Sequence, residues 1–196
     1  MPPITLTKQI EDIVLGNSIS NLHRSSNLSQ KIDSSYKKHP KKWNNAICYG
    51  HANQAFRKDS KLPSKQKEAI GKIVDAGYGD KYSKLMGIKN HQQKHFNPNN
   101  IQESGFVSFI NNRQSRNDGV FHTGYIQRDG NQVHLYHANA NDLDIALIGK
   151  DALKTAGPLA TYTLSDPTKA DSLNLWLAKN DYSFTHTPNS QLTRNL

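Results

Sequence analysis

Three apolar stretches in the second half of the chain decide the fold: GFVSFI at 105–110, GVFHTGYIQ at 119–127 and QVHLYHA at 132–138. They are rich in β-branched and aromatic residues, a composition typical of strands. Asp129-Gly130-Asn131 separates the second stretch from the third and is a strong hairpin signal. The three stretches therefore predict neighbouring antiparallel strands.

Helical patterns lie on both sides of these strands. Before them, the spacing of apolar residues predicts helices over 5–15, 44–57, 64–76 and 80–88. After them, LATYTL at 159–164 predicts one more strand, and 167–179 predicts a helix with Pro167 in its first turn. Helices first, antiparallel strands second and a terminal helix indicate an α+β fold rather than alternating βαβ units.

The composition divides the chain into three parts. Residues 1–35 combine the first helix with a Ser- and Asn-rich leader, and 36–180 hold the predicted elements of one domain. Residues 181–196 are polar and are expected to form a frayed tail. A chain of 196 residues is long enough for one domain with a hydrophobic core.

The chain is basic, with 25 Lys and Arg against 16 Asp and Glu and a formal charge of +9. This charge favours anionic partners such as cell-wall polymer, although a solvated basic surface explains it equally well. The sequence contains neither a P-loop nor a GxGxxG motif, so nucleotide chemistry has no support. Nucleic acid is not the expected partner.

The first residues, MPPITLTKQIEDIVLG, do not combine a basic stretch with a continuous apolar one. No apolar run reaches the length of a membrane span. We therefore expect a protein made in the cytoplasm without a cleavable signal and without a membrane span. If it acts elsewhere, a specialised secretion system must deliver it to a target periplasm or a host cell.

Cys48 is the only cysteine and falls in the first turn of the helix predicted over 44–57. A single cysteine excludes an internal disulfide and a cysteine-based zinc site. A thiol attacks only as a thiolate. Because its free pKa is about 8.5, it needs a helix N-terminus or a histidine nearby to lose its proton near neutral pH. His91 and His95 have the i,i+4 spacing of metal ligands but lack the HExxH glutamate, so no metal site is predicted.

Strand alternation narrows the choice among the nine histidines. Each of the two central strands should place one histidine on its inner face, and the residues sharing these faces are Val120, His122, Gly124 and Ile126 on one strand and Val133, Leu135 and His137 on the other. Both histidines are expected to point toward the helix that bears Cys48. His122 would then act as the base, and His137 would orient its ring.

Other residues compete for the third role or for contact with substrate. Asn139, Asn141 or Asp142 could replace His137 as the group that orients the base. Five residues near the predicted nucleophile and base are expected to contact substrate, namely Asn45, Tyr49, His51, Gly124 and Asn139.

These residues resemble a known family. Gly105–Ile110, then His122-Thr123-Gly124-Tyr125-Ile126, the turn at 129–131 and a strand ending His137-Ala138 look like the second half of NlpC/P60 papain-like cysteine hydrolases. Cys48, His122 and His137 match the three catalytic positions of that family. The cysteine motif departs from the usual Asp-Cys-Ser-Gly and reads Ile47-Cys48-Tyr49-Gly50. The resemblance covers roughly 44–165.

The resemblance implies a papain-like fold, with N-terminal helices packed on an antiparallel sheet and the nucleophile at a helix N-terminus. It also implies a Cys-His-His triad that hydrolyses amide bonds without a cofactor, most often in peptidoglycan peptides. A bacterial toxin of this kind would have a cognate immunity or inhibitor protein as a partner.

Two other functions are open. Relatives of this kind include proteases, deamidases and acyltransferases that act on host proteins as effectors. A non-enzymatic basic binding module is the second alternative, and it predicts a salt-sensitive interaction that does not need Cys48.

Overall fold

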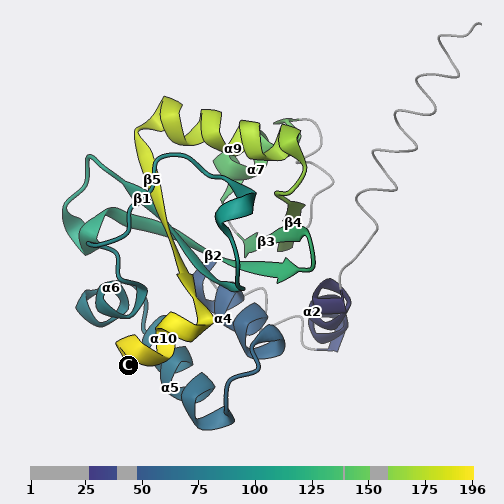
Figure 1. Ribbon diagram of the computed structural model, residues 1–196, viewed down its shortest axis with the longest axis vertical. Coiled ribbons are helices and arrows are strands. Elements are labelled where there is room, and N and C mark those ends of the chain that lie inside the picture. Colours follow the sequence, from purple (N-terminus) through teal and green to yellow (C-terminus); the bar gives the residue numbers. More distant parts are fainter. Residues whose placement is uncertain (1–26, 39–47, 139, 151–158) are drawn as a thin grey trace, which may run out of the picture.

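The computed structural model describes residues 27–38, 48–138, 140–150 and 159–196. Its centre is a five-stranded sheet in the order β4-β3-β2-β1-β5, and all four neighbouring pairs are antiparallel. The strands are β1 Gly105–Asn111, β2 Val120–Asp129, β3 Gln132–Ala138, β4 Leu159–Thr163 and β5 Tyr182–Pro188. Helices cover both faces of this sheet, which confirms the predicted α+β class (Figure 1).

The predicted hairpin connects β2 to β3. Asp129 pairs with Gln132, so the loop contains only two residues. Gly130 at its tip has a φ of +57°, a conformation that glycine adopts without steric cost. This turn fixes the register of the two central strands, which carry both candidate histidines.

One helical layer lies on the face of the sheet that α4 covers. It consists of α2 Asn27–Lys38, α4 Cys48–Asp59, α5 Ser64–Asp75, α6 Asp80–Met86 and α10 Asn189–Asn195. The opposite face is covered by α7 Asn141–Ile148 and α9 Pro167–Asn180 (Figure 1). Two short 3-10 helices, Pro98–Asn100 and Arg116–Gly119, lie in the connections.

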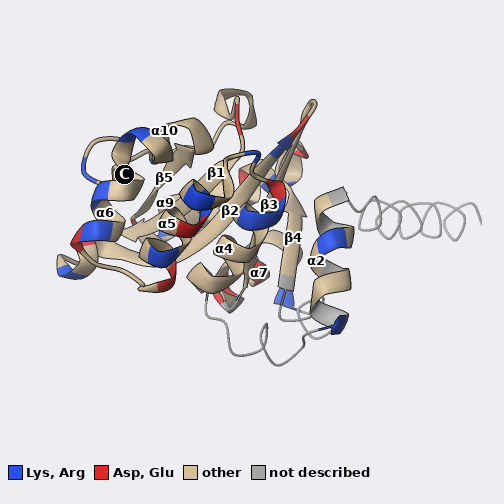
Figure 2. Cartoon of the chain, turned by 90° about the horizontal axis from the view of Figure 1, so that it is seen from below, with Lys and Arg blue, Asp and Glu red and all other residues tan. Residues whose placement is uncertain are grey.

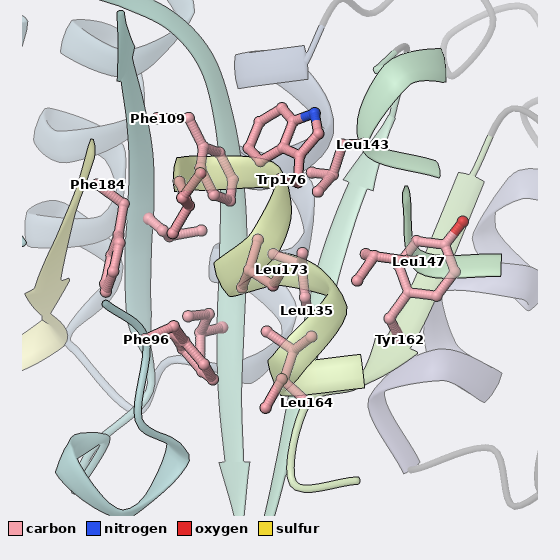
Figure 3. Close-up of a cluster of buried hydrophobic side chains, with 14 of the residues drawn as sticks. Phe96, Phe109, Leu135, Leu143, Leu147, Tyr162, Leu164, Leu173, Trp176 and Phe184 are labelled. Carbon is pink, nitrogen blue, oxygen red and sulfur yellow. The ribbon is translucent and has the colours of Figure 1, made fainter. Parts of the chain in front are cut away.

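Each face of the sheet has its own hydrophobic core. On the α4 face, Phe56 packs against Phe106 and Tyr125 with ring centroids 5.1 and 6.3 Å away. On the α9 face, Phe109 packs edge-on against Trp176 at 5.6 Å, and Figure 3 shows this cluster between α9 and the strands. A side chain therefore belongs to one chemical environment or the other according to the face from which it projects.

Most predicted elements are present. The helices expected over 64–76, 80–88 and 167–179 correspond to α5, α6 and α9, and Pro167 lies in the first turn of α9 with Asp166 as N-cap. The helix expected over 44–57 corresponds to α4, although 44–47 lie outside the described residues. The helix expected over 5–15 also falls outside them.

Two expectations about domain boundaries are wrong. The boundary after residue 35 falls inside α2, whose Leu28 and Ile32 are buried in the core of the α4 face. The stretch expected to be a polar tail forms β5 and α10, with Phe184 and Leu192 almost completely buried. Tertiary contacts, rather than local composition, decide both ends of the folded unit.

Within the described ranges, every helix is too short or too polar to cross a lipid bilayer.

Candidate functional site

Cys48 is the first described residue of α4, which packs against β2 and β3. Its side chain is partly exposed, and its sulfur lies 2.9 Å from the hydroxyl oxygen of Tyr78. Tyr78 follows Gly77, which has a φ of +84° just beyond the end of α5 and turns the chain toward α6. The thiol is thus held by a residue 30 positions away that its own helix does not supply.

A group of hydroxyls near Tyr78 joins α6 to the sheet. Oγ1 of Thr123 on β2 lies 2.6 Å from the hydroxyl oxygen of Tyr82 on α6, whose ring packs against that of Tyr78. The Tyr82 hydroxyl is also 2.8 Å from Oγ of Ser108 on β1. Tyr82, Ser108 and Thr123 are buried, so these groups satisfy one another away from water.

Tyr78 stays protonated in this setting. Burial raises the pKa of its phenol, and the negative charge that Cys48 can carry raises it further. The rings of Tyr49 and Tyr82 lie edge-on to it at 5.5 and 5.2 Å. The hydroxyl can therefore donate a hydrogen bond to the sulfur, and the two neighbouring rings restrict its position.

His122 lies on the other face of the sheet. Its ring stacks on Phe109 at 5.8 Å and meets His137 edge-on at 5.2 Å. Burial lowers the pKa of His122 well below its usual value, and the neighbouring His137 lowers it further. Its Nε2 is buried without a hydrogen-bond partner, which marks an unusual environment for a polar atom.

His137 joins a carboxylate on the same face. Its Nε2 lies 3.2 Å from Oδ1 of Asp144 on α7, and the Tyr162 hydroxyl donates to the same oxygen at 2.6 Å. Burial alone would raise the pKa of Asp144, but its contacts with His137 and Tyr162 hold that pKa below the usual value. The side chains of His137 and Asp144 are 0% and 9% exposed, so this pair does not face solvent.

Asp144 was not among the residues considered from the sequence. The alternative Asp142 is exposed, and Asn139 and the side chain of Asn141 lie outside the described part of the chain. A helical pattern over 141–148 would have identified Asp144, because Leu143 and Leu147 bracket it on the buried side. Tyr78 had no comparable signal, since its contact with Cys48 joins distant segments.

The expectation that His122 and His137 share one face is confirmed, but the expectation that they face the helix of Cys48 is wrong. Thr123 and Tyr125 of β2 project toward α4 and α6, and alternation sends His122 the other way. The predicted triad is therefore not assembled in this conformation.

A β-bulge also changes the expected pattern at the start of β2. Phe109 pairs with His122 and Ile110 pairs with Val120, so Phe121 is an extra residue. Val120 consequently packs in the core of the α4 face. Alternation alone predicted that Val120 shares a face with His122, and that expectation is wrong.

The residues predicted to contact substrate lie in different surroundings. Gly124 is buried, and a Cβ there would lie 2.9 Å from Leu135 Cδ1 and 3.0 Å from the Tyr136 carbonyl oxygen. Strand β3, rather than substrate, thus occupies the space beside it. His51 is buried one turn along α4 from Cys48, while Tyr49 is partly buried against Tyr78. Asn45 and Asn139 lie outside the described ranges.

His91 and His95 are both exposed and lie outside the helices. Across the parts of the chain that are described, no group of three or more His, Cys, Asp or Glu side chains is arranged to hold a metal ion.

We predict that the protein loses stability in mild acid because it buries several histidines. Burial lowers the pKa of His122 well below its usual value, and lowers that of His186 to about 4 despite the opposing charge of Glu103. The unfolded chain binds protons at both positions below about pH 6.5 while the folded chain does not, so stability falls as pH decreases. Between pH 7.5 and 5, His186 should cost about 2 kcal/mol of unfolding free energy, and His122 should add to this loss.

Urea unfolding at several pH values measures this effect. Replacing His186 with Phe should flatten the profile, whereas replacing the exposed His91 with Gln should leave its slope unchanged. An unfolding free energy that stays constant between pH 7.5 and 5 would contradict the prediction.

Comparison with other proteins adds a family but no activity. Neither the curated proteins nor the solved structures include a significant match to this chain. One family model matches residues 24–196, and its description is "Domain of unknown function (DUF8038)". The match covers most of the chain, which therefore belongs to the DUF8038 family.

Proposed function

We propose that the protein is a cysteine-dependent amide-bond hydrolase of the papain-like NlpC/P60 type, with Cys48 as its nucleophile. The observation that carries this proposal is the partly exposed thiol at the start of α4, with its sulfur 2.9 Å from a phenol that keeps its proton. The resemblance of the strands around His122 and His137 to that family is the second support. Peptidoglycan peptides are the proposed substrate, and a bacterial toxin delivered by a specialised secretion system is the proposed role.

The chemistry would begin at the start of α4. The Cys48 thiolate attacks the substrate carbonyl, where a carbon–sulfur bond forms, and the partial positive charge of the helix N-terminus stabilises the developing oxyanion. The carbon–nitrogen bond then breaks, and the leaving amine takes a proton from the conjugate acid of the base. Water then attacks the thioester and gives one proton to the base, and the carbon–sulfur bond breaks to release the carboxylic acid product and the Cys48 thiolate.

His122 is the proposed base, and it must reach the α4 face to act. The bulge at Phe121 offers a route, because a bulge can move along a strand by one residue. If Phe121 paired with Phe109, His122 would become the extra residue and would project beside Thr123, next to Tyr78. The left-handed backbone of Asn117 and Asp118 just before β2 is a strained segment that could adjust to such a shift.

A disulfide trap tests whether position 122 reaches Cys48. Because Cys48 is the only cysteine, His122→Cys creates a single possible intramolecular pair. We expect mild oxidation to link the two sulfurs in the folded protein, as measured by loss of free thiol and mass spectrometry. Phe121→Cys is the matched control, and equal or faster linkage through position 121 would argue against the bulge shift.

The substrate class is tested with the full chain. We expect incubation with purified peptidoglycan to release new amino groups, and mass spectrometry of the products to identify the cleaved bond. Cleavage or deamidation of host proteins without action on cell wall would instead support the effector alternative. No reaction with either class would remove the hydrolase proposal.

A non-enzymatic binding module is the second candidate. It is favoured by the orientation of His122 and His137, which face away from Cys48. Lys and Arg side chains lie on α2, α5, α6 and α10, with acidic residues among those of α5 and α6 (Figure 2). This candidate predicts salt-sensitive binding to an anionic polymer that the Cys48→Ala variant retains.

A further inference from the structure

Two tyrosines stand between the sheet and the sulfur of Cys48. The Tyr82 hydroxyl is 2.8 Å from Oγ of Ser108 and 2.6 Å from Oγ1 of Thr123, so hydrogen bonds to the sheet fix its position. The ring of Tyr78 packs edge-on against that of Tyr82 at 5.2 Å, and its hydroxyl oxygen lies 2.9 Å from the sulfur. Tyr78 can therefore use its one proton toward Cys48.

We propose that Tyr78 is a positioning residue for Cys48, which donates a hydrogen bond to the sulfur and is held in place by the rings of Tyr49 and Tyr82. This role deepens the proposed hydrolase function and rests on it for its meaning in catalysis. The hydrogen bond itself stands on the 2.9 Å contact alone.

The arrangement stabilises the charged form of the sulfur over the neutral form. A phenol that keeps its proton donates more strongly to a thiolate than to a thiol, because hydrogen bonds to ionised acceptors are the stronger ones. The edge-on rings of Tyr49 and Tyr82 keep the phenol from turning away.

Alkylation of the thiol measures this effect without any substrate. Since the chain has one cysteine, the rate of its reaction with iodoacetamide at each pH reports Cys48 alone. In Tyr78→Phe, we expect the pH midpoint of alkylation to rise by about one unit, because the variant loses a donor to the thiolate. Thr123→Val removes a hydrogen-bond partner of Tyr82, whose ring packs against Tyr78, and should raise the midpoint by a smaller amount.

Tyr182→Phe is the matched control, because its ring packs near Phe121 and Trp176 on the other face of the sheet. Its alkylation profile should equal that of the unmodified protein. A merely structural role for Tyr78 would lower the melting temperature and leave the pH midpoint unchanged, and that result would overturn the proposal. If Tyr78→Phe does not fold, an unchanged midpoint in Thr123→Val overturns it instead.

The outcome separates this inference from the hydrolase proposal. A raised midpoint without hydrolysis of any substrate would keep the role of Tyr78 at the thiol and remove the assigned reaction. Hydrolysis with an unchanged midpoint in both variants would keep the reaction and remove Tyr78 from it.

Discussion

Cys48→Ala is expected to abolish amide hydrolysis, with a loss of about 10⁴-fold or more in kcat/KM. Alanine cannot form the thioester, so the two-step reaction through an acyl-enzyme has no substitute pathway. The measurement is the rate of amine release from peptidoglycan by the variant and by the unmodified protein at equal concentration. Retained release by the variant would exclude Cys48 as the nucleophile.

The stability of each Cys48 variant decides whether a loss of activity reflects lost chemistry or unfolding. Cys48 is partly exposed, so its replacement by alanine should change the unfolding free energy by no more than about 1 kcal/mol. Cys48→Ser replaces the thiol with a hydroxyl that can still bond to Tyr78 but is a weaker nucleophile. We expect this variant to fold normally and to lose nearly as much activity as the alanine variant. A large fall in the melting temperature of either variant would assign the loss to unfolding rather than to chemistry.

Leu192→Ala should lower the unfolding free energy by about 2–5 kcal/mol, the usual cost of deleting a buried leucine side chain. Leu192 is 0% exposed and packs in the core of the α4 face, although it lies only four residues from the end of the chain. Typical domains are stable by about 5–15 kcal/mol, so this single change removes a large share of the total. Urea or thermal unfolding measures it directly.

Leu196→Ala is the matched control for this prediction. Leu196 belongs to the same terminal stretch but is 51% exposed, so its truncation should cost less than about 0.5 kcal/mol. Equal and small effects at both leucines would mean that the terminal residues form the polar tail that their composition suggests, and not part of the core.

The sequence predicted the central hairpin and its neighbours well because their signals are local. Strand composition, the Gly130 turn and the Pro167 start of α9 depend on residues that are close together in the chain. The terminal strand β5 was missed for the opposite reason. Its residues YSFTHTP look polar, and β1 stabilises them by pairing along their whole length.

The candidate site was predicted in part. Alternation correctly placed His122 and His137 on one face, but no local pattern states which helices cover that face. The partners that matter, Tyr78 for Cys48 and Asp144 for His137, are supplied by other segments. The extra residue at Phe121 also arises from pairing between strands, which composition does not reveal.

The sequence by itself determined that an antiparallel sheet forms, where its hairpin turns, and that the one thiol lies on a helix, because each of these depends on short-range backbone preferences. Only the tertiary structure decided that α4 covers the face opposite the two histidines and that a phenol meets the sulfur. The physical reason is that both faces of the sheet are apolar enough to bury a helical layer, so the choice between them is made by the packing of the whole chain.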